Sequence, residues 1–214
     1  VLSLSVLVVG SALAQGVSPE SAEKYNAGQD LFKKRRYQEA LKVFEEAVGL
    51  DAKNAQAYRA MGKTYQKLRN YKDAVEAFKM ATTVKADYAE AYFELGQIQY
   101  QTKDYQGAQA SLKKALSIDQ NIAEGKARDM LKAAYIREGI TLLKRRNAKA
   151  AAAQFESAAQ VDPSDATVFY NLGLAHKIAR NSNAAREALE TAVELDPAHG
   201  KAHRTLGDLF RATG

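Results

Sequence analysis

Small and large hydrophobic positions recur along this chain with a long and regular period. The glycines that belong to the pattern are separated by 34, 34, 43, 34 and 34 residues. Each of the first five is followed by two alanines, 12 and 19 residues further on, with a large apolar residue between them. Self-similarity of this kind is typical of repeat proteins, in which each repeat is one supersecondary unit. The glycines are Gly28, Gly62, Gly96, Gly139, Gly173 and Gly207.

Packing of two helices in each repeat explains this spacing. Gly and Ala let two antiparallel helices approach closely, and the large residue fills the gap against the next pair. Because each pair keeps one face that it cannot bury alone, the pairs must stack. The chain contains 40 Ala and only 3 Pro. The paired alanines of the pattern are Ala40 and Ala47, Ala74 and Ala81, Ala108 and Ala115, Ala151 and Ala158, and Ala185 and Ala192. The large residues are Phe44, Phe78, Leu112, Phe155 and Leu189.

The motif that opens and closes each repeat resembles the tetratricopeptide repeat (TPR), which has 34 residues. Tyr92–Gly96 and Phe169–Gly173 match its aromatic and Leu-Gly opening, and Val161–Pro163 and Leu195–Pro197 match its close. The resemblance covers about residues 21–214. It implies an all-α fold, a TPR solenoid of antiparallel helix pairs that forms a right-handed superhelix.

The repeats divide the chain into segments, with an irregular stretch between the third and the fourth. Glu138 stands in place of the Leu before Gly139, and Gln99 and His176 replace the second aromatic of their repeats. The inserted residues either lengthen the next helix by ~13 Å, at 1.5 Å per residue, or form a short helix broken near Gly125. We assign a partial signal peptide to 1–14, a linker to 15–20, TPR repeats 1–3 to 21–122, a helical insertion to 123–131, repeats 4–5 to 132–199, and the first helix of a truncated repeat 6 to 200–214.

The first fourteen residues are typical of a secretory signal peptide. An apolar run at 1–9 is followed by small residues at Ala12 and Ala14, and no charge precedes Glu20. We therefore expect cleavage after Ala14 and a periplasmic or secreted protein of the bacterial cell envelope. A buried N-terminal strand or helix and a retained membrane anchor are the alternatives.

The residue types give no support to catalysis. There are 0 Cys and 3 His, and no phosphate-binding loop, nucleophile elbow or HExxH motif occurs. His199 and His203 have the i, i+4 spacing of zinc ligands, but no third His or Cys lies near them in the sequence, and His203 occupies a packing position. We expect neither an enzyme, nor a cofactor, nor a metal site.

Positive charge is concentrated at one phase of the repeat. The net charge is +6, and basic runs occur at 33–36, 67–69 and 144–146, where each first helix ends. They can complement helix dipoles and keep the protein soluble. Alternatively they form a basic rim that meets an anionic membrane surface, a polyanion or an acidic partner. Nucleic acid is not expected as a partner, because the aromatic residues fall largely at repeat positions used for packing rather than beside the basic runs.

The resemblance also implies which side chains line the concave groove. Repeats 1–3 would present aromatics, amides and cations suited to an extended peptide, and repeats 4–5 an apolar strip that is either buried by neighbouring pairs or open to a partner. The set of Lys, Asn and Arg with which some TPR domains clamp a C-terminal carboxylate is incomplete here. The implied groove residues are Tyr25, Gln29, Phe32, Arg59, Lys63, Gln66, Phe93, Gln97, Tyr100, Ile136, Ile140, Leu143, Tyr170, Leu174 and Lys177.

We therefore expect an exported protein–protein interaction scaffold that binds protein or peptide segments in this groove. The alternative is that the repeats recruit a substrate or partner for a larger envelope enzyme or sensor, of which they form the N-terminal part. The sequence carries no signal for an oligomeric state.

Overall fold

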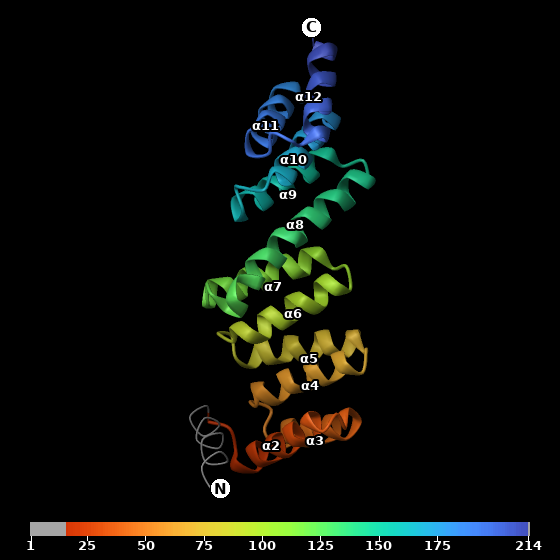
Figure 1. Ribbon diagram of the computed structural model, residues 1–214. Coiled ribbons are helices and arrows are strands. Elements are labelled where there is room, and N and C mark those ends of the chain that lie inside the picture. The colour runs from red at the N-terminus through yellow and green to blue at the C-terminus, as the bar shows by residue number, and fades with distance from the viewer. Residues whose placement is uncertain (1–15, 214) are drawn as a thin grey trace. The chain divides into compact units, whose positions relative to one another are not determined.

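The computed structural model describes residues 16–213, and these residues form helices joined by short turns (Figure 1). No strand occurs in the described range. The predicted signal peptide lies outside the described residues, and the first helix starts within the predicted linker. The helices are α2 (Pro19–Lys33), α3 (Tyr37–Leu50), α4 (Ala55–Lys67), α5 (Tyr71–Val84), α6 (Ala89–Gln101), α7 (Tyr105–Ile118), the 3₁₀ turn η1 (Ile122–Gly125), α8 (Lys126–Lys144), α9 (Ala148–Val161), α10 (Ala166–Ile178), α11 (Ser182–Leu195) and α12 (Gly200–Thr213).

Short polar side chains fix where most helices begin. A helix leaves its first backbone N–H groups without partners, and a preceding Asn, Asp or Ser can accept a hydrogen bond from one of them. This is observed for α2, α4, α5, α9, α10 and α11, whose capping residues are Ser18, Asn54, Asn70, Asn147, Asp165 and Asn181.

Successive helices pack as antiparallel pairs, and the contact is the one that the glycine spacing predicts. A Cβ atom added to Gly62 on α4 would lie 2.7 Å from Cδ1 of Phe78 on α5. The Phe78 ring is fully buried, so it occupies the space that the missing Cβ leaves. The same arrangement joins Gly28 to Phe44, Gly96 to Leu112, Gly139 to Phe155 and Gly173 to Leu189.

The chain divides into two compact units. Unit 1 contains described residues up to 104 together with 111–122, and unit 2 contains 105–110 together with 123 onward. Within each unit the large residues also connect one pair to the next. In unit 1, Phe78 packs with Leu95 and Ile98 of α6. In unit 2, Phe155 packs with Leu172 of α10.

The inserted residues combine the two arrangements that the sequence left open. The backbone breaks at η1, where Ala123, Glu124 and Gly125 have φ angles of 55°, 54° and 86°. After this break α8 runs for 19 residues, from Lys126 to Lys144. The helix therefore starts six residues before residue 132, and the extension is shorter than the ~13 Å expected, because three consecutive left-handed residues cannot continue a right-handed helix.

A polar cluster lies in unit 2 where Glu138 replaces an apolar residue. Glu138 is 6% exposed, and its Oε1 accepts a hydrogen bond of 3.0 Å from the Gln106 amide. Gln109 is also buried and donates to Gln154 at 2.9 Å. Buried polar groups are tolerated when they find such partners, so these bonds satisfy side chains that would otherwise destabilise unit 2.

The described residues thus confirm an all-α fold of stacked antiparallel helix pairs. The right-handed sense of the superhelix stays a prediction. No helix within 16–213 is long and apolar enough to cross a membrane.

Candidate functional site

All fifteen predicted groove residues lie on the first helix of a pair, and every one is half-buried. The structure places nine of them on α2, α4 and α6 in unit 1, and six on α8 and α10 in unit 2. A half-buried side chain is held on one side by its neighbours and accessible on the other. This is the environment expected of side chains that a rigid scaffold presents to a ligand.

Aromatic and amide side chains order one another on α2. The Tyr25 ring lies 6.0 Å from the Phe44 ring, and the Gln29 amide donates a hydrogen bond of 2.9 Å to the Tyr25 hydroxyl. Burial raises the pKa of Tyr25, and the bond from Gln29 opposes that change. Phe32 meets Tyr37 edge to face at 5.2 Å between ring centres. These contacts restrict the rotamers of the predicted groove residues of repeat 1.

A cluster of charges links α4 to α6 in unit 1. The Arg59 guanidinium donates two hydrogen bonds of 2.7 Å to the Glu94 carboxylate, and it lies 5.6 Å from the centre of the Tyr88 ring. Burial alone would lower the pKa of Arg59, but the hydrogen bonds and charge of Glu94 outweigh it, so the pKa lies above its ordinary value. The Lys63 ammonium lies 3.8 Å from the same carboxylate.

This cluster changes the part that Arg59 can play. Its charge is largely matched by Glu94, so Arg59 mainly positions the two first helices, and the two cations and one carboxylate leave a single net positive charge. Sequence reasoning missed Glu94 and Tyr88. A signal was present, because Glu94 directly follows the inward position of Phe93 and lies 35 residues after Arg59.

The amides of two other groove residues in unit 1 have no hydrogen-bond partner within 16–213. They belong to Gln66 on α4 and Gln97 on α6, and both are partly exposed. Phe93 and Tyr100 are half-buried on α6 as well. Unit 1 therefore offers amide donors and acceptors beside aromatic faces on consecutive first helices.

The apolar strip of unit 2 is partly covered by the neighbouring pair. Ile136, Ile140 and Leu143 on α8 pack against the buried cluster that contains Phe155 and Leu172. The sequence left open whether this strip is buried by neighbouring pairs or open to a partner, and half-burial lies between these two alternatives. Tyr170 and Leu174 on α10 are half-buried too and complete the strip, and the half-buried Lys177 follows them on the same helix.

The two histidines with zinc-ligand spacing make structural contacts. The His199 ring lies 5.1 Å from the Tyr170 ring, and its Nδ1 accepts a hydrogen bond of 3.2 Å from the backbone N–H of Ala202. The His203 ring nitrogen Nε2 lies 2.9 Å from the backbone carbonyl of Pro197. The two side chains thus stabilise the start of α12. No group of three or more metal-ligating side chains occurs within 16–213.

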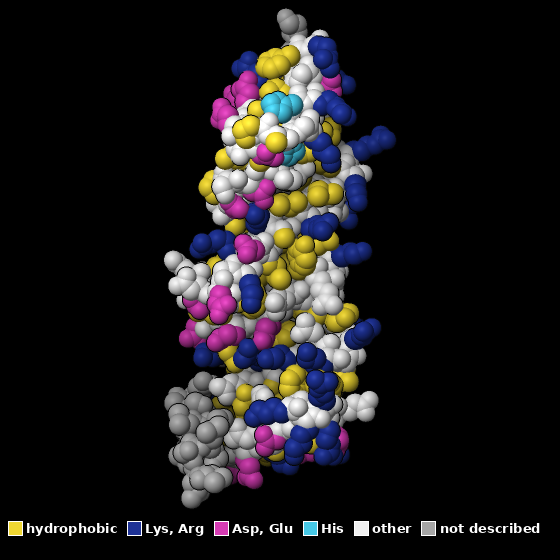
Figure 2. Space-filling model, viewed as in Figure 1, with side chains coloured by type: hydrophobic (Ala, Val, Ile, Leu, Met, Phe, Trp, Pro, Cys, Tyr) yellow, Lys and Arg dark blue, Asp and Glu magenta, His cyan; other side chains and the backbone are white. Residues whose placement is uncertain are grey.

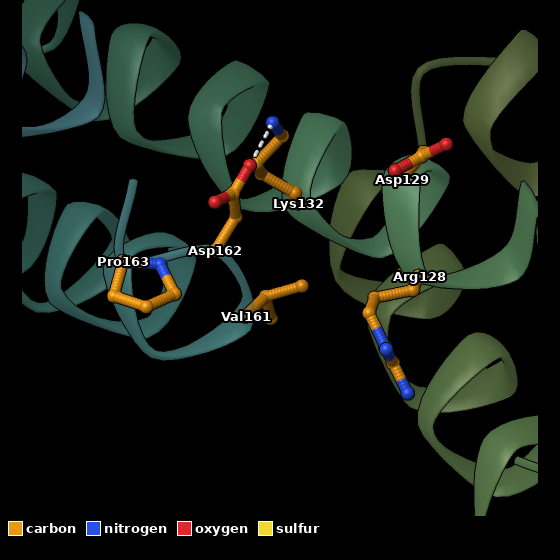
Figure 3. A pocket seen from close by; sticks show the side chains of 6 residues that line it. All are labelled: Arg128, Asp129, Lys132, Val161, Asp162 and Pro163. Atoms are coloured by element: carbon orange, nitrogen blue, oxygen red, sulfur yellow. Dashed lines mark hydrogen bonds and ion pairs between the residues drawn. The ribbon is translucent and has the colours of Figure 1, made fainter. Parts of the chain in front are cut away.

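A cavity of 240 Å³ lies where the start of α8 meets the end of α9 (Figure 3). The Lys132 ammonium points toward the Asp162 carboxylate at 2.8 Å and also binds Asp165 at 3.0 Å. Its charge is therefore taken up by the protein itself. The cavity is lined by Arg128, Asp129, Lys132, Val161, Asp162 and Pro163.

Stability should depend on pH through Asp162. Hydrogen bonds from Lys132 and from Ser164 lower the pKa of Asp162 from its ordinary 3.8 to about 2. Since the folded pKa is depressed, the stabilisation is present above about pH 4 and disappears as the pH falls toward 2. We expect Asp162→Asn to melt at a lower temperature than the wild type at neutral pH. The difference should shrink in acid, and a difference that is constant from pH 7 to pH 2 would refute this linkage.

Two shallow cavities occupy equivalent repeat positions in the two units. Gln99 and His176 stand where the repeat pattern has its second aromatic, and their smaller side chains leave space between adjacent pairs. The cavity in unit 1 measures 330 Å³ and is lined by Tyr71, Lys72, Val75, Glu76, Gln99, Thr102 and Asp104. The cavity in unit 2 measures 260 Å³ and is lined by Lys149, Ala152, Ala153, Glu156, His176, Ala179 and Asn181.

The helix pairs are stacked through a recurring glycine and a large residue, and ordered side chains lie on the first helices. This arrangement defines a helical-repeat protein of the kind that presents a binding surface. The family follows from sequence comparison. Tetratricopeptide repeat models match residues 59–121, 136–177 and 166–199, and a TPR repeat model matches residues 28–68. Together they span most of the described chain, which belongs to the tetratricopeptide repeat family. No curated protein matches it.

Solved TPR structures share the fold. YrrB, described as a TPR protein with an unusual peptide-binding site, is 25% identical, with a TM-score of 0.54 over 85% of this chain and 89% of its own. A TPR repeats protein from Bacteroides fragilis is 17% identical, with a TM-score of 0.65 over 90% and 98% of the two chains. MamA is 20% identical, with a TM-score of 0.53 over 85% and 94%.

Proposed function

We propose that this chain is a non-enzymatic scaffold that binds extended protein or peptide segments across the first helices of unit 1. The observation that carries the proposal is the pair of amides without internal partners, on Gln66 and Gln97, beside the half-buried rings of Phe93 and Tyr100. The likeness to YrrB, whose description names a peptide-binding site, supports it.

The chemistry of an extended segment fits these groups. Its backbone offers alternating N–H and C=O groups, and side-chain amides can both donate to and accept from them. Aromatic faces add apolar contact area at low cost in side-chain entropy. Because contacts within the protein already restrict Tyr25, Gln29, Phe32 and Arg59, ordering these side chains on binding would cost little further entropy.

The charge of unit 1 sets the kind of segment that would fit best. Glu94 matches Arg59, and Lys63 lies near the same carboxylate. The residual single positive charge favours a segment with few charges or a modest acidic character over a strongly basic one. Lys63 is the groove cation best placed to meet an acidic side chain, because 44% of its side chain is exposed.

A randomised peptide library displayed on phage, panned against the full chain, tests this proposal. Selected peptides should bind the wild type and bind a Phe93→Ala/Gln97→Ala variant at least about tenfold more weakly, as is common for central contact residues. Met80→Ala is the matched control, since Met80 is 43% exposed on the second helix α5. Failure to enrich any peptide, or equal binding by both variants, would refute the assignment.

We further propose that residues 1–14 direct export to the periplasm or beyond. The support is the apolar run followed by small residues at 12 and 14. A fusion of residues 1–20 to alkaline phosphatase, which is active only after export, tests the proposal, and a deletion of residues 1–9 is the control. Equal phosphatase activity in the two fusions would contradict it.

A further inference from the structure

The first helix of each of the five complete repeats ends in the same cap. After α2, the Arg35 N–H donates to the Phe32 carbonyl at 2.9 Å and the Arg36 N–H donates to the Leu31 carbonyl at 3.0 Å. This pair of bonds is the Schellman motif, in which the first residue after the cap adopts a left-handed conformation. The equivalent residues are Arg35, Arg69, Lys103, Arg146 and Arg180, with φ angles of 60°, 60°, 65°, 60° and 62°.

The residue type at these five positions is unexpected. Glycine is favoured there, since a Cβ makes left-handed backbone unfavourable. This chain has 13 Gly, yet all five positions carry Arg or Lys. A preference for local stability would select glycine, so the basic side chain must serve another purpose.

Pairing within the chain does not supply that purpose. All five side chains are exposed, and none forms an ion pair with another residue between 16 and 213. Helix-dipole complementation does not require them either, because Lys33, Lys67 and Lys144 already lie in the last turns of their helices. The last turn of α10 likewise contains Lys177. Only α6 has no basic residue in its last turn, so dipole complementation accounts for Lys103 alone among the five.

Figure 1 shows the turns after α4, α6 and α8 at the right of the view, and in Figure 2 Lys and Arg side chains occur along this edge, among others on the same face. We define the rim of each unit as its exposed cations at this edge that have no ion pair in the described range. The unit 1 rim is Lys34, Arg35, Lys67, Arg69, Lys72 and Lys103. The unit 2 rim is Lys144, Arg145, Arg146, Lys149 and Arg180.

We propose that these rims bind an anionic lipid surface through its phosphate headgroups. Cations at protruding turn tips can contact a flat surface together, without a cavity or an induced fit. Clusters of four to eight Lys or Arg are of the size that binds anionic lipids, and each cation adds to the attraction.

The structure disfavours the other anionic partners. An acidic protein segment could enter the cavities beside the rims, where it would meet the carboxylates of Glu76 and Asp104 in unit 1 and of Glu156 in unit 2, whereas a flat membrane surface touches the turn tips alone. Single-stranded nucleic acid binds by stacking on accessible aromatic rings. The aromatic rings next to the rim cations in sequence, among them Tyr37, Tyr71 and Tyr100, are half-buried, and the one exposed aromatic within the described residues, Phe210 on α12, lies outside both rims.

Glycine substitution separates this surface role from folding. The variant Arg35→Gly/Arg69→Gly/Lys103→Gly should melt several degrees above the wild type, since glycine relieves the left-handed positions. Its affinity for vesicles that contain phosphatidylglycerol should fall by about 100-fold, given the typical contribution of each cation near such a surface. The unit 2 variant Arg146→Gly/Arg180→Gly should lose about 30-fold. Wild-type binding should weaken as salt is added.

Cosedimentation of the full chain with vesicles measures these effects. Residues 1–14 are present in every variant, so differences report the rims. Lys42→Gln/Lys53→Gln/Lys114→Gln removes the same charge from exposed positions elsewhere in unit 1, and it should change the affinity by less than about threefold. Equal binding by the glycine variant, equal binding to phosphatidylcholine alone, or binding to poly-glutamate or DNA without binding to vesicles would overturn the proposal.

Discussion

Replacing Phe78 by alanine is expected to lower the free energy of unfolding by about 4 kcal/mol, the typical loss for a fully buried Phe. The ring is 0% exposed. It fills the space above Gly62 within its own pair, and it also packs with Leu95 and Ile98 of the next pair. The substitution therefore leaves a cavity that borders two helix pairs. The pairs cannot close this cavity from one side without losing contacts on the other.

Urea unfolding followed by circular dichroism measures this loss. Met80→Ala on the same helix is the control, because Met80 is 43% exposed and its truncation should cost less than about 1 kcal/mol. Since each pair contacts only its neighbours, the Phe78 variant should also lose cooperativity near α5. A loss below about 1 kcal/mol would show that this ring does not couple the two pairs.

The second large effect is expected from Gly173→Ala. The added Cβ would lie 2.6 Å from Cγ of Leu189 and 3.1 Å from the backbone carbonyl oxygen of Ala185. Neither atom is the free end of a flexible side chain, so the two helices must move apart. Overpacking of this kind costs about 2 kcal/mol.

Gly207 provides a matched control for this substitution. It occupies the same repeat position on α12, but no atom of the described residues lies within 4 Å of an added Cβ. Gly207→Ala should therefore stabilise the protein by up to about 1 kcal/mol, as alanine favours helix more than glycine does. Thermal unfolding of the two variants should shift in opposite directions. A shift in the same direction would contradict close approach as the reason for Gly173.

The periodic part of the fold could be predicted because each contact repeats. Gly62 and Phe78 form one such contact, and the four equivalent contacts in the other repeats reinforced the pattern. Half-burial of the groove positions follows from the same periodicity. Features that occur once could not be predicted in this way. The left-handed run at 123–125 is one of them, because nothing in the periodicity specifies the backbone of a single insertion.

The chemistry of the candidate site was less predictable than its position. Arg59 was expected to face a ligand, and the structure shows it held by Glu94 across two repeats. Side-chain partners between adjacent pairs depend on rotamers, which a repeat pattern does not specify. The basic runs were visible in the sequence, but the left-handed conformation of one cation per repeat became apparent only from the backbone.

Site-specific photo-crosslinking tests most directly the claim that a peptide lies across the first helices of unit 1. A benzophenone amino acid would be placed at residue 97 on α6 or, as a control, at residue 80 on α5, and each protein would be irradiated with a peptide selected from the library. We predict a crosslink from residue 97 and none from residue 80. A crosslink from residue 80 and none from residue 97 would contradict the account.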